Sequence, residues 1–296
     1  MLASAGIRGI RSYEDAASAI GRLDAAGRFA AAGLRELLVL RCIATPTRVP
    51  HTGMIALVRA DGEGDDSLRE FAAGLRQGAA RARGGALPSV ASLHESLRLP
   101  LPQWQPSTVD ELLRDAHERT PPLLKAALVA LALRAAAGGD PDAPHTAQLV
   151  AIAVTLVLCV GGATTDAWLT LPRANAGTDH SLRETFATLA REARAAERGL
   201  LAAQELVEAD EQRVRDSLGR AAYSALDMLV LLREKIVVTI PDAARALGQT
   251  PPTAGAAVAR LVALGIAREV TGKARSRAFA YEGIVKALEP ESVTKR

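Results

Sequence analysis

Two segments of the sequence are almost entirely apolar, and they limit what the chain can fold into. One runs from Leu149 to Val160 with Thr155 as its single polar residue, and the other is PPLLKAALVALALRAAAGG at residues 121–139. The first is too short to cross a bilayer, and Lys125 and Arg134 interrupt the second. A helix that is apolar on all sides has to be enclosed by other helices. The sequence therefore predicts two buried helices at the centre of a helical domain and no transmembrane segment.

The composition favours helices along the rest of the chain. Apolar residues make up 49% of the sequence but aromatic residues only 3%, so the core has to be built from small and aliphatic side chains. Helical spacing over residues 14–43, and segments rich in Glu and Arg from residue 181 onward, predict further helices. With 296 residues the chain can form two or three domains. We predict a mainly α protein with domains at residues 1–105, 106–215 and 216–296.

The cysteines and the N-terminus bear on the cellular compartment. Cys42 and Cys159 form neither a disulfide framework nor a CxxC metal motif. The first residues, MLASAGIRGIRSYEDAA, lack the apolar core of a secretory signal. Both observations predict a cytoplasmic protein.

The last eighty residues show an ordered series of structural signals. A helix that ends near Lys235 is followed by the β-branched run IVVTI, and Thr239 can cap a short helix that stops at Gly248. A short turn leads to a second helix closed by Gly265, and two strand-like runs follow, IAREV and SRAFAY. This order predicts a winged helix-turn-helix domain with a two- or three-stranded wing. The residues predicted to fill its small core are Ala243, Ala244, Leu247, Ala254, Ala257, Val258, Leu261 and Leu264.

The charge of this domain indicates a polyanionic partner. Residues 216–296 carry 12 Lys plus Arg against 8 Asp plus Glu, whereas the whole chain has a net charge of only +3. A winged helix places its second helix in the major groove of DNA and its basic wing beside the phosphates. The candidate residues are Thr250, Thr253 and Arg260 on the second helix, with Gly255 and Ala256 also exposed, and Lys273, Arg275 and Arg277 on the wing. Winged helices also mediate protein contacts, so a protein partner is the alternative.

The same residues resemble a known family. The stretch PDAARALGQTPPTAGAAVARLVALGIAREVTGKARSRAFAYEGIVKAL, residues 241–288, resembles the winged helix at the C-terminus of many bacterial Fic-domain proteins. The segment TPPLLKAALV, residues 120–129, resembles the helix that leads into the Fic active-site loop. The resemblance implies a Fic-like helical bundle at residues 106–215 and an ancestral transfer of AMP from ATP to a protein hydroxyl.

The chemistry of that family is missing from the corresponding loop. Fic enzymes use a loop of the form His-Pro-Phe-x-Asp-Gly-Asn-Gly-Arg followed by a second arginine, in which His is the general base and Asp holds the metal. Aligned without gaps, the base position becomes Ala137, the metal position Pro141, and the arginines become His145 and Gln148. The inhibitory Ser-x-x-x-Glu-Gly motif corresponds to ATPTRVPHTG, where proline replaces the glutamate. We therefore predict no catalytic residue, no bound metal and no cofactor.

Two alternatives to this interpretation remain open. Asp140, Asp142 and His145 could form a metal or catalytic cluster, although Asp residues in a Gly/Pro loop more often serve turns and helix caps. An unusual loop could still carry out adenylyl transfer.

The sequence as a whole predicts a bacterial transcriptional regulator on a catalytically inactive Fic-like scaffold. It would bind double-stranded DNA as a homodimer that pairs through the helices at 181–215. The alternatives are a protein adenylyltransferase and a non-catalytic protein-interaction module.

Overall fold

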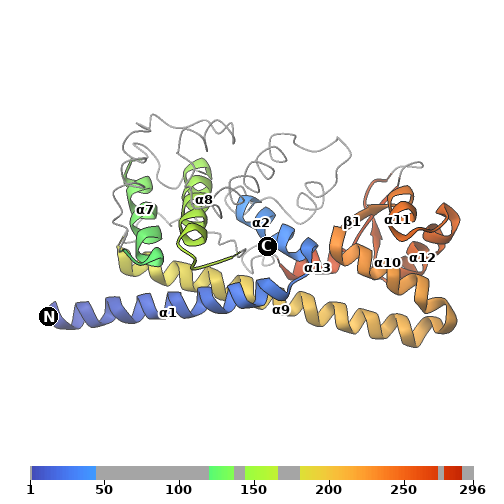
Figure 1. Cartoon of the computed structure of the whole chain (residues 1–296), viewed down its shortest axis with the longest axis horizontal. Helices are drawn as coiled ribbons and strands as arrows, with labels where there is room; N and C mark the ends of the chain where they lie inside the picture. Colours follow the sequence, from blue (N-terminus) through green and yellow to red (C-terminus); the bar gives the residue numbers. More distant parts are fainter. Residues whose placement is uncertain (1, 45–119, 137–143, 166–180, 273–276, 289–296) are drawn as a thin grey trace. The chain divides into compact units, whose positions relative to one another are not determined.

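The computed structural model describes residues 2–44, 120–136, 144–165, 181–272 and 277–288 (Figure 1). This part of the chain is mainly helical, with one small three-stranded antiparallel sheet. Contacts divide the chain into two compact units. The first holds α1 (Leu2–Phe29) up to Arg28, α7 (Pro122–Ala136), α8 (Pro144–Val160) and the start of α9 (Leu182–Leu218). The second holds residues 29–37 and everything described from Arg198 onward.

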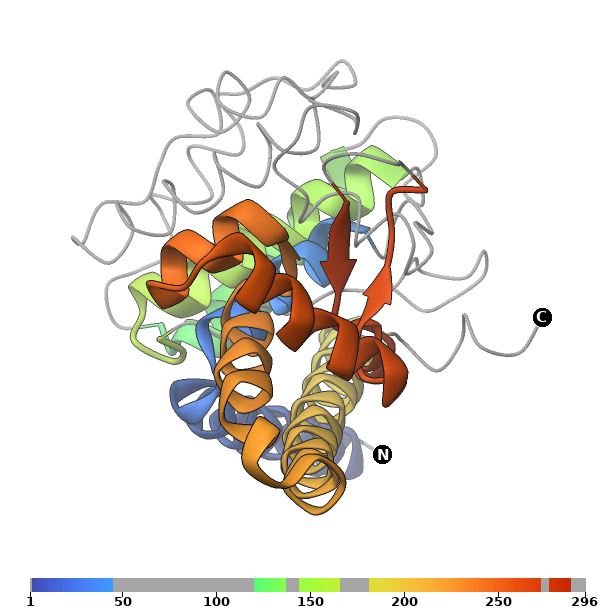
Figure 2. The ribbon, with the colours of Figure 1, turned by 90° about the vertical axis from the view of Figure 1, so that its right-hand side faces the viewer.

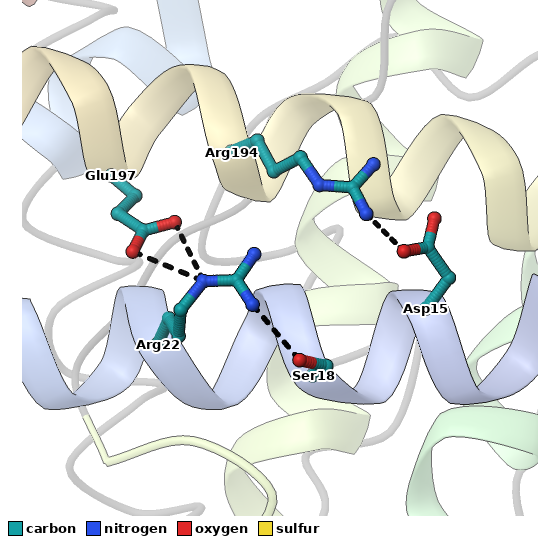
Figure 3. Close-up of polar contacts among 5 residues, drawn as sticks. All are labelled: Asp15, Ser18, Arg22, Arg194 and Glu197. Atoms are coloured by element: carbon teal, nitrogen blue, oxygen red, sulfur yellow. Dashed lines mark hydrogen bonds and ion pairs between the residues drawn. The ribbon is translucent and has the colours of Figure 1, made fainter.

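In the first unit, α1 and the start of α9 lie side by side and run in the same direction (Figure 3). The Arg194 guanidinium donates to Asp15, and Arg22 Nε donates to both carboxylate oxygens of Glu197 at 3.2 and 3.3 Å. Near the middle of α1 and the start of α9, the rings of Tyr13 and Phe186 pack edge to face with their centroids 5.4 Å apart. Because these ion pairs are exposed to water, each contributes little to stability, and the edge-to-face contact of the two rings contributes more.

A buried carboxylate connects α1 to the segment that follows α8. Asp24 accepts hydrogen bonds from the Thr165 backbone N–H at 2.5 Å and from its hydroxyl at 2.8 Å, and it pairs with Arg28. Burial by itself raises the pKa of Asp24, but the bonds from Thr165 and Arg28 outweigh that effect and lower it. Asp24 thus remains ionised in an apolar setting because every bond it accepts favours the charged form.

The two apolar segments form α7 and α8, as the sequence predicts. A side chain at Gly161, just after α8, would lie 2.4 Å from Cβ of Pro122, so the end of α8 meets the start of α7 at very short range. The buried contacts come from Ala126, Ala130 and Leu133 on α7 and from most of α8. α7 is buried along most of its length, as predicted, but it is not enclosed on every side, since Leu128 is 44% exposed.

Three further predictions concern the N-terminal helical stretch and the domain boundaries. The stretch at residues 14–43, predicted to be helical, belongs to two helices. Ala30 and Ala31 are not helical and separate α1 from α2 (Ala32–Ala44). The boundary predicted at 105/106 lies outside the described residues. The boundary predicted at 215/216 falls within α9. The division into three domains stays a prediction.

The second unit ends in a small module that follows α9. A 3-10 turn (Gly219–Ala221) leads to α10 (Ala222–Lys235), β1 (Val237–Thr239), α11 (Ile240–Leu247) and α12 (Pro251–Ala263). β2 (Arg268–Glu269), β3 (Ala278–Ala280) and α13 (Glu282–Ala287) follow (Figure 2). The sheet order is β1-β3-β2, with Val237 opposite Ala280 and Arg268 opposite the same residue from the other side.

Two of the local signals that set these boundaries, Thr239 and Gly248, are the predicted ones, whereas the cap at Thr250 was not predicted. The Thr239 hydroxyl accepts the Asp242 N–H at the start of α11, and Gly248 ends that helix in the left-handed conformation with φ of 62°. Thr250 caps α12 in the same manner by accepting the Thr253 N–H. Of the eight predicted core residues, all are buried except Leu247 and Leu264, which are half-buried at the ends of their helices.

Candidate nucleic-acid interface

The exposed face of α12 offers few groups that could read a DNA base. Thr250 and Thr253 are exposed as predicted, but their hydroxyls are 2.9 Å apart and bond to each other while capping the helix. Arg260 is half-buried, and its Nη1 donates to the Ser224 hydroxyl on α10 at 3.1 Å. Gly255 is half-buried as well, with Ile240 of α11 within 3.7 Å of the position of a Cβ. The other exposed residues of α12 are all apolar: Pro251, Pro252, Ala256, Ala259, Val262 and Ala263.

The hairpin between β2 and β3 is shaped by one carboxylate. Glu269 accepts hydrogen bonds from the Thr271 N–H at 2.8 Å, from the Gly272 N–H at 3.0 Å and from the Thr271 hydroxyl. Gly272 has φ of 62°, where a side chain would be strained. Thr271 Oγ1 in turn accepts the N–H of Ala278, the first residue of the returning strand. The Glu-x-Thr-Gly sequence at residues 269–272 thus turns the chain between the two strands.

The hairpin carries cations and no acid beyond Glu269. Arg277 is exposed, and its guanidinium lies 5.8 Å from the centre of the Phe279 ring, a cation–π contact that leaves its N–H groups open to solvent. Lys273 and Arg275 lie outside the described residues. The sequence from Val270 to Tyr281 contains no Asp or Glu. Positive charge therefore concentrates on one short turn.

The hairpin requires Glu269 in its ionised form. We therefore expect the hydrogen-bonded conformation of the hairpin to depend on pH. The hydrogen bonds from Thr271 are the largest cause that lowers the pKa of Glu269 from its ordinary value of 4.5, with a smaller effect of Arg277. A carboxylate with a lowered folded pKa stabilises the fold above the unfolded pKa, and the stabilisation is lost as pH falls through the folded value. We expect the amide resonances of Thr271 and Gly272 to shift together in an NMR titration with a midpoint below pH 4.5.

Glu269→Gln provides the control for this titration. The variant should remove the acid transition at both amides and leave the helical signal unchanged. A midpoint at or above 4.5 would contradict the stated role of Thr271 and Gly272.

A buried network fixes the module to α9. Tyr281 is fully buried, and its hydroxyl donates to Asp210 Oδ2 at 2.6 Å. The other oxygen of Asp210 is 3.2 Å from Arg213 Nη1, an ion pair whose angle falls outside hydrogen-bonding range. Arg213 Nη1 also donates to the Leu264 carbonyl at the end of α12, at 3.4 Å. The network therefore ties the end of α12 and the end of β3 to one helix, and nothing in the sequence indicated it.

The residues that the resemblance aligns with the Fic loop have no described side chains. Ala137, Asp140, Pro141 and Asp142 lie outside the described residues, and His145 is placed only as part of the first turn of α8. Within the described residues no group of three or more His, Cys, Asp or Glu could hold a metal ion. No described helix is both long and apolar enough to span a membrane. The loss of catalysis and the adenylyltransferase alternative both remain predictions.

No protein-family model matches the sequence, and no curated protein matches it. The site therefore has to be interpreted from its own geometry and charge.

Proposed function

We propose that the module at residues 222–288 is a winged helix that binds double-stranded DNA mainly through its phosphates. The observation that carries the proposal is the β2–β3 hairpin, which is held by Glu269 and whose sequence contains Lys273, Arg275 and Arg277 and no acid other than Glu269. Three cations in one short segment can contact several phosphates of a duplex, each of which carries a negative charge. The pair of helices α11 and α12 beside the sheet would place α12 at the major groove.

The hairpin and the exposed face of α12 would contribute in different ways to DNA binding. Phosphate contacts from the hairpin supply affinity without sequence information, and base contacts have to come from α12. Thr250 and Thr253 are the exposed hydroxyls there, and Arg260 can reach a base only if it releases Ser224. We therefore propose a regulator with modest sequence discrimination for each module.

The wider proposal is a bacterial, cytoplasmic transcriptional regulator on a catalytically inactive Fic-like scaffold, acting as a homodimer. The structure bears on how two copies would pair. The apolar residues of α9, such as Leu189, Leu200 and Val207, are buried within the chain, and Leu201 is the large apolar residue that this helix exposes. Pairing through residues 181–215 would therefore use the charged face of α9.

A salt titration of DNA binding tests the proposal. The full chain, mixed with a fluorescently labelled duplex, should show an anisotropy increase that weakens steeply with salt. Each phosphate contact contributes about 0.9 to the slope of log affinity against log salt, so three contacts give about 2.7 per module. Neutralising Lys273, Arg275 and Arg277 to Gln together should remove nearly all of that slope. Arg277→Gln by itself should reduce it by about 0.9.

The matched control is Arg220→Gln, an exposed cation on the turn before α10. α10 has 14 residues, so this turn lies about 21 Å along the helix from the end that leads into the sheet. The control should change the slope far less than Arg277→Gln. Absence of binding to any duplex at low salt would reject the DNA proposal.

A second candidate function is a protein contact through α12. It is favoured by the exposed apolar row on that helix, which includes Pro252, Ala256 and Ala259. If the duplex does not bind at low salt while the module remains folded, this function takes the place of the first.

A further inference from the structure

A groove of about 560 Å³ lies within the second unit, apart from the candidate DNA interface. It is bounded by residues 29–35, which run from the last residue of α1 into the start of α2, by the second half of α9, and by the last turn of α10. Its volume falls in the range of small-molecule sites, which is about 300 to 1,000 Å³. Neither the resemblance nor the DNA proposal gives this groove a role.

The groove has an apolar part that includes an unusually exposed aromatic ring. Phe29 is 86% exposed, more than any other large apolar residue in the described part of the chain. Leu34 and Val207, which also line the groove, are buried and form a fixed wall. A phenylalanine ring left in water beside such a wall forgoes a large apolar burial that a ligand could recover.

The charged residues of the groove are acidic in balance. Three glutamates, Glu208, Glu211 and Glu234, face two arginines, Arg35 and Arg233. Glu234 accepts the Ala32 N–H at 3.0 Å, and Glu211 pairs with Arg215 at 2.9 Å outside the groove lining. These two carboxylates are therefore already engaged within the protein.

Glu208, the remaining carboxylate, and the position of Arg233 indicate which charge the ligand carries. Glu208 is exposed and has no hydrogen bond or ion pair among the residues that the structure describes. Arg233 lies between two acids, with Nη1 3.8 Å from Glu211 and Nε 3.9 Å from Glu234. Arg35, the other arginine of the lining, also has a partner within the protein. An incoming anion would therefore have to compete for either arginine, whereas an incoming cation meets an open carboxylate.

We propose that this groove binds an organic cation with an apolar body. The cationic centre pairs with Glu208, and the body packs on the Phe29 ring against Leu34 and Val207. A cation near an aromatic face gains additional electrostatic attraction from the ring. The site does not require that the protein bind DNA.

The test uses two ions of nearly the same shape and opposite charge. Calorimetric titration of the full chain with tetraphenylphosphonium should show saturable binding, and tetraphenylborate should bind at least about tenfold more weakly. Glu208→Gln should weaken phosphonium binding about fivefold or more, and Phe29→Ala about tenfold. Both residues are exposed, so neither change should unfold the protein, which circular dichroism verifies.

Glu205→Gln is the matched control, because Glu205 is an exposed acid of the same helix that does not line the groove. It should leave phosphonium affinity within about twofold of the unchanged protein. Equal affinity for the two ions would mean non-specific apolar adsorption and would overturn the proposal. So would the absence of phosphonium binding, or binding that Glu208→Gln and Phe29→Ala leave unchanged.

Discussion

Tyr281→Phe is expected to lower the free energy of unfolding by about 2 to 3 kcal/mol, although it removes a single oxygen atom. The hydroxyl donates at 2.6 Å to Asp210, which is only 3% exposed. Its loss leaves a buried carboxylate oxygen without a donor, because the neighbouring Arg213 reaches the other oxygen. Burial and the bond to Asp210 raise the pKa of Tyr281, so the hydroxyl remains a donor throughout the ordinary pH range. Urea unfolding followed by circular dichroism measures the loss.

Two further variants isolate the hydrogen bond from other effects of the change. Tyr223→Phe is the same substitution at a tyrosine that is 79% exposed, and it should alter stability by less than about 0.5 kcal/mol. The double variant Tyr281→Phe with Asp210→Ala should cost less than the sum of the two single changes, because each single change removes the same hydrogen bond. Additive costs would show that the two side chains do not depend on each other.

Gly33→Ala is expected to destabilise the protein by about 2 to 3 kcal/mol, against the usual preference of helices for alanine. A Cβ at this position of α2 would lie 2.4 Å from the Arg233 carbonyl oxygen and 2.9 Å from that of Glu234. It would also lie 2.8 Å from Cδ1 of Ile236. Backbone atoms cannot rotate away as a side chain does, so α2 and the end of α10 would have to separate. Thermal unfolding and urea unfolding should both report the loss.

The control for this change is Gly21→Ala on α1. Gly21 is exposed, and a Cβ there would meet nothing within 4 Å. The substitution should stabilise the protein by about 0.5 to 1 kcal/mol, because alanine restricts the unfolded chain and favours the helix. A neutral or stabilising Gly33→Ala would contradict the close approach of α2 to α10.

Ile236 has a strained backbone conformation that tertiary contacts stabilise. It has φ of 63°, a region that a β-branched residue rarely occupies, and it is fully buried between α10 and β1. Its N–H donates to the Leu232 carbonyl at 2.7 Å, and its carbonyl accepts the Tyr281 N–H at 2.9 Å. The sequence IVVTI predicted only a strand here. The strained turn is accepted because the residue fills the core and both of its backbone groups are bonded.

Elements with local causes could be predicted from the sequence. Thr239 and Thr250 begin α11 and α12 because a hydroxyl can satisfy an N–H three residues later, and Gly248 ends α11 because it tolerates positive φ. The same holds for α7 and α8, whose apolar composition requires burial. By contrast, the break between α1 and α2 falls in an alanine-rich stretch, AAA at residues 30–32, which carries no stop signal.

The candidate interface shows the same division. Lys273, Arg275 and Arg277 could be found from the sequence, because a cluster of cations without acids is a property of composition. Arg260 could not be judged in that way, because its hydrogen bond to Ser224 joins residues 36 positions apart. Nor could the groove beside Phe29 be found, since its walls come from segments far apart in the chain.

The sequence by itself thus determined the helical class, the order of elements in the C-terminal module and the position of its positive charge. Each of these follows from interactions within a few residues, such as caps, apolar periodicity and local charge. Only the tertiary structure decided that Asp210 serves Tyr281 across 71 positions, that Gly33 has to be glycine, and that α12 exposes an apolar face. These three features depend on which surfaces meet after folding. Close packing between distant segments leaves no local sequence pattern from which the packing could be predicted.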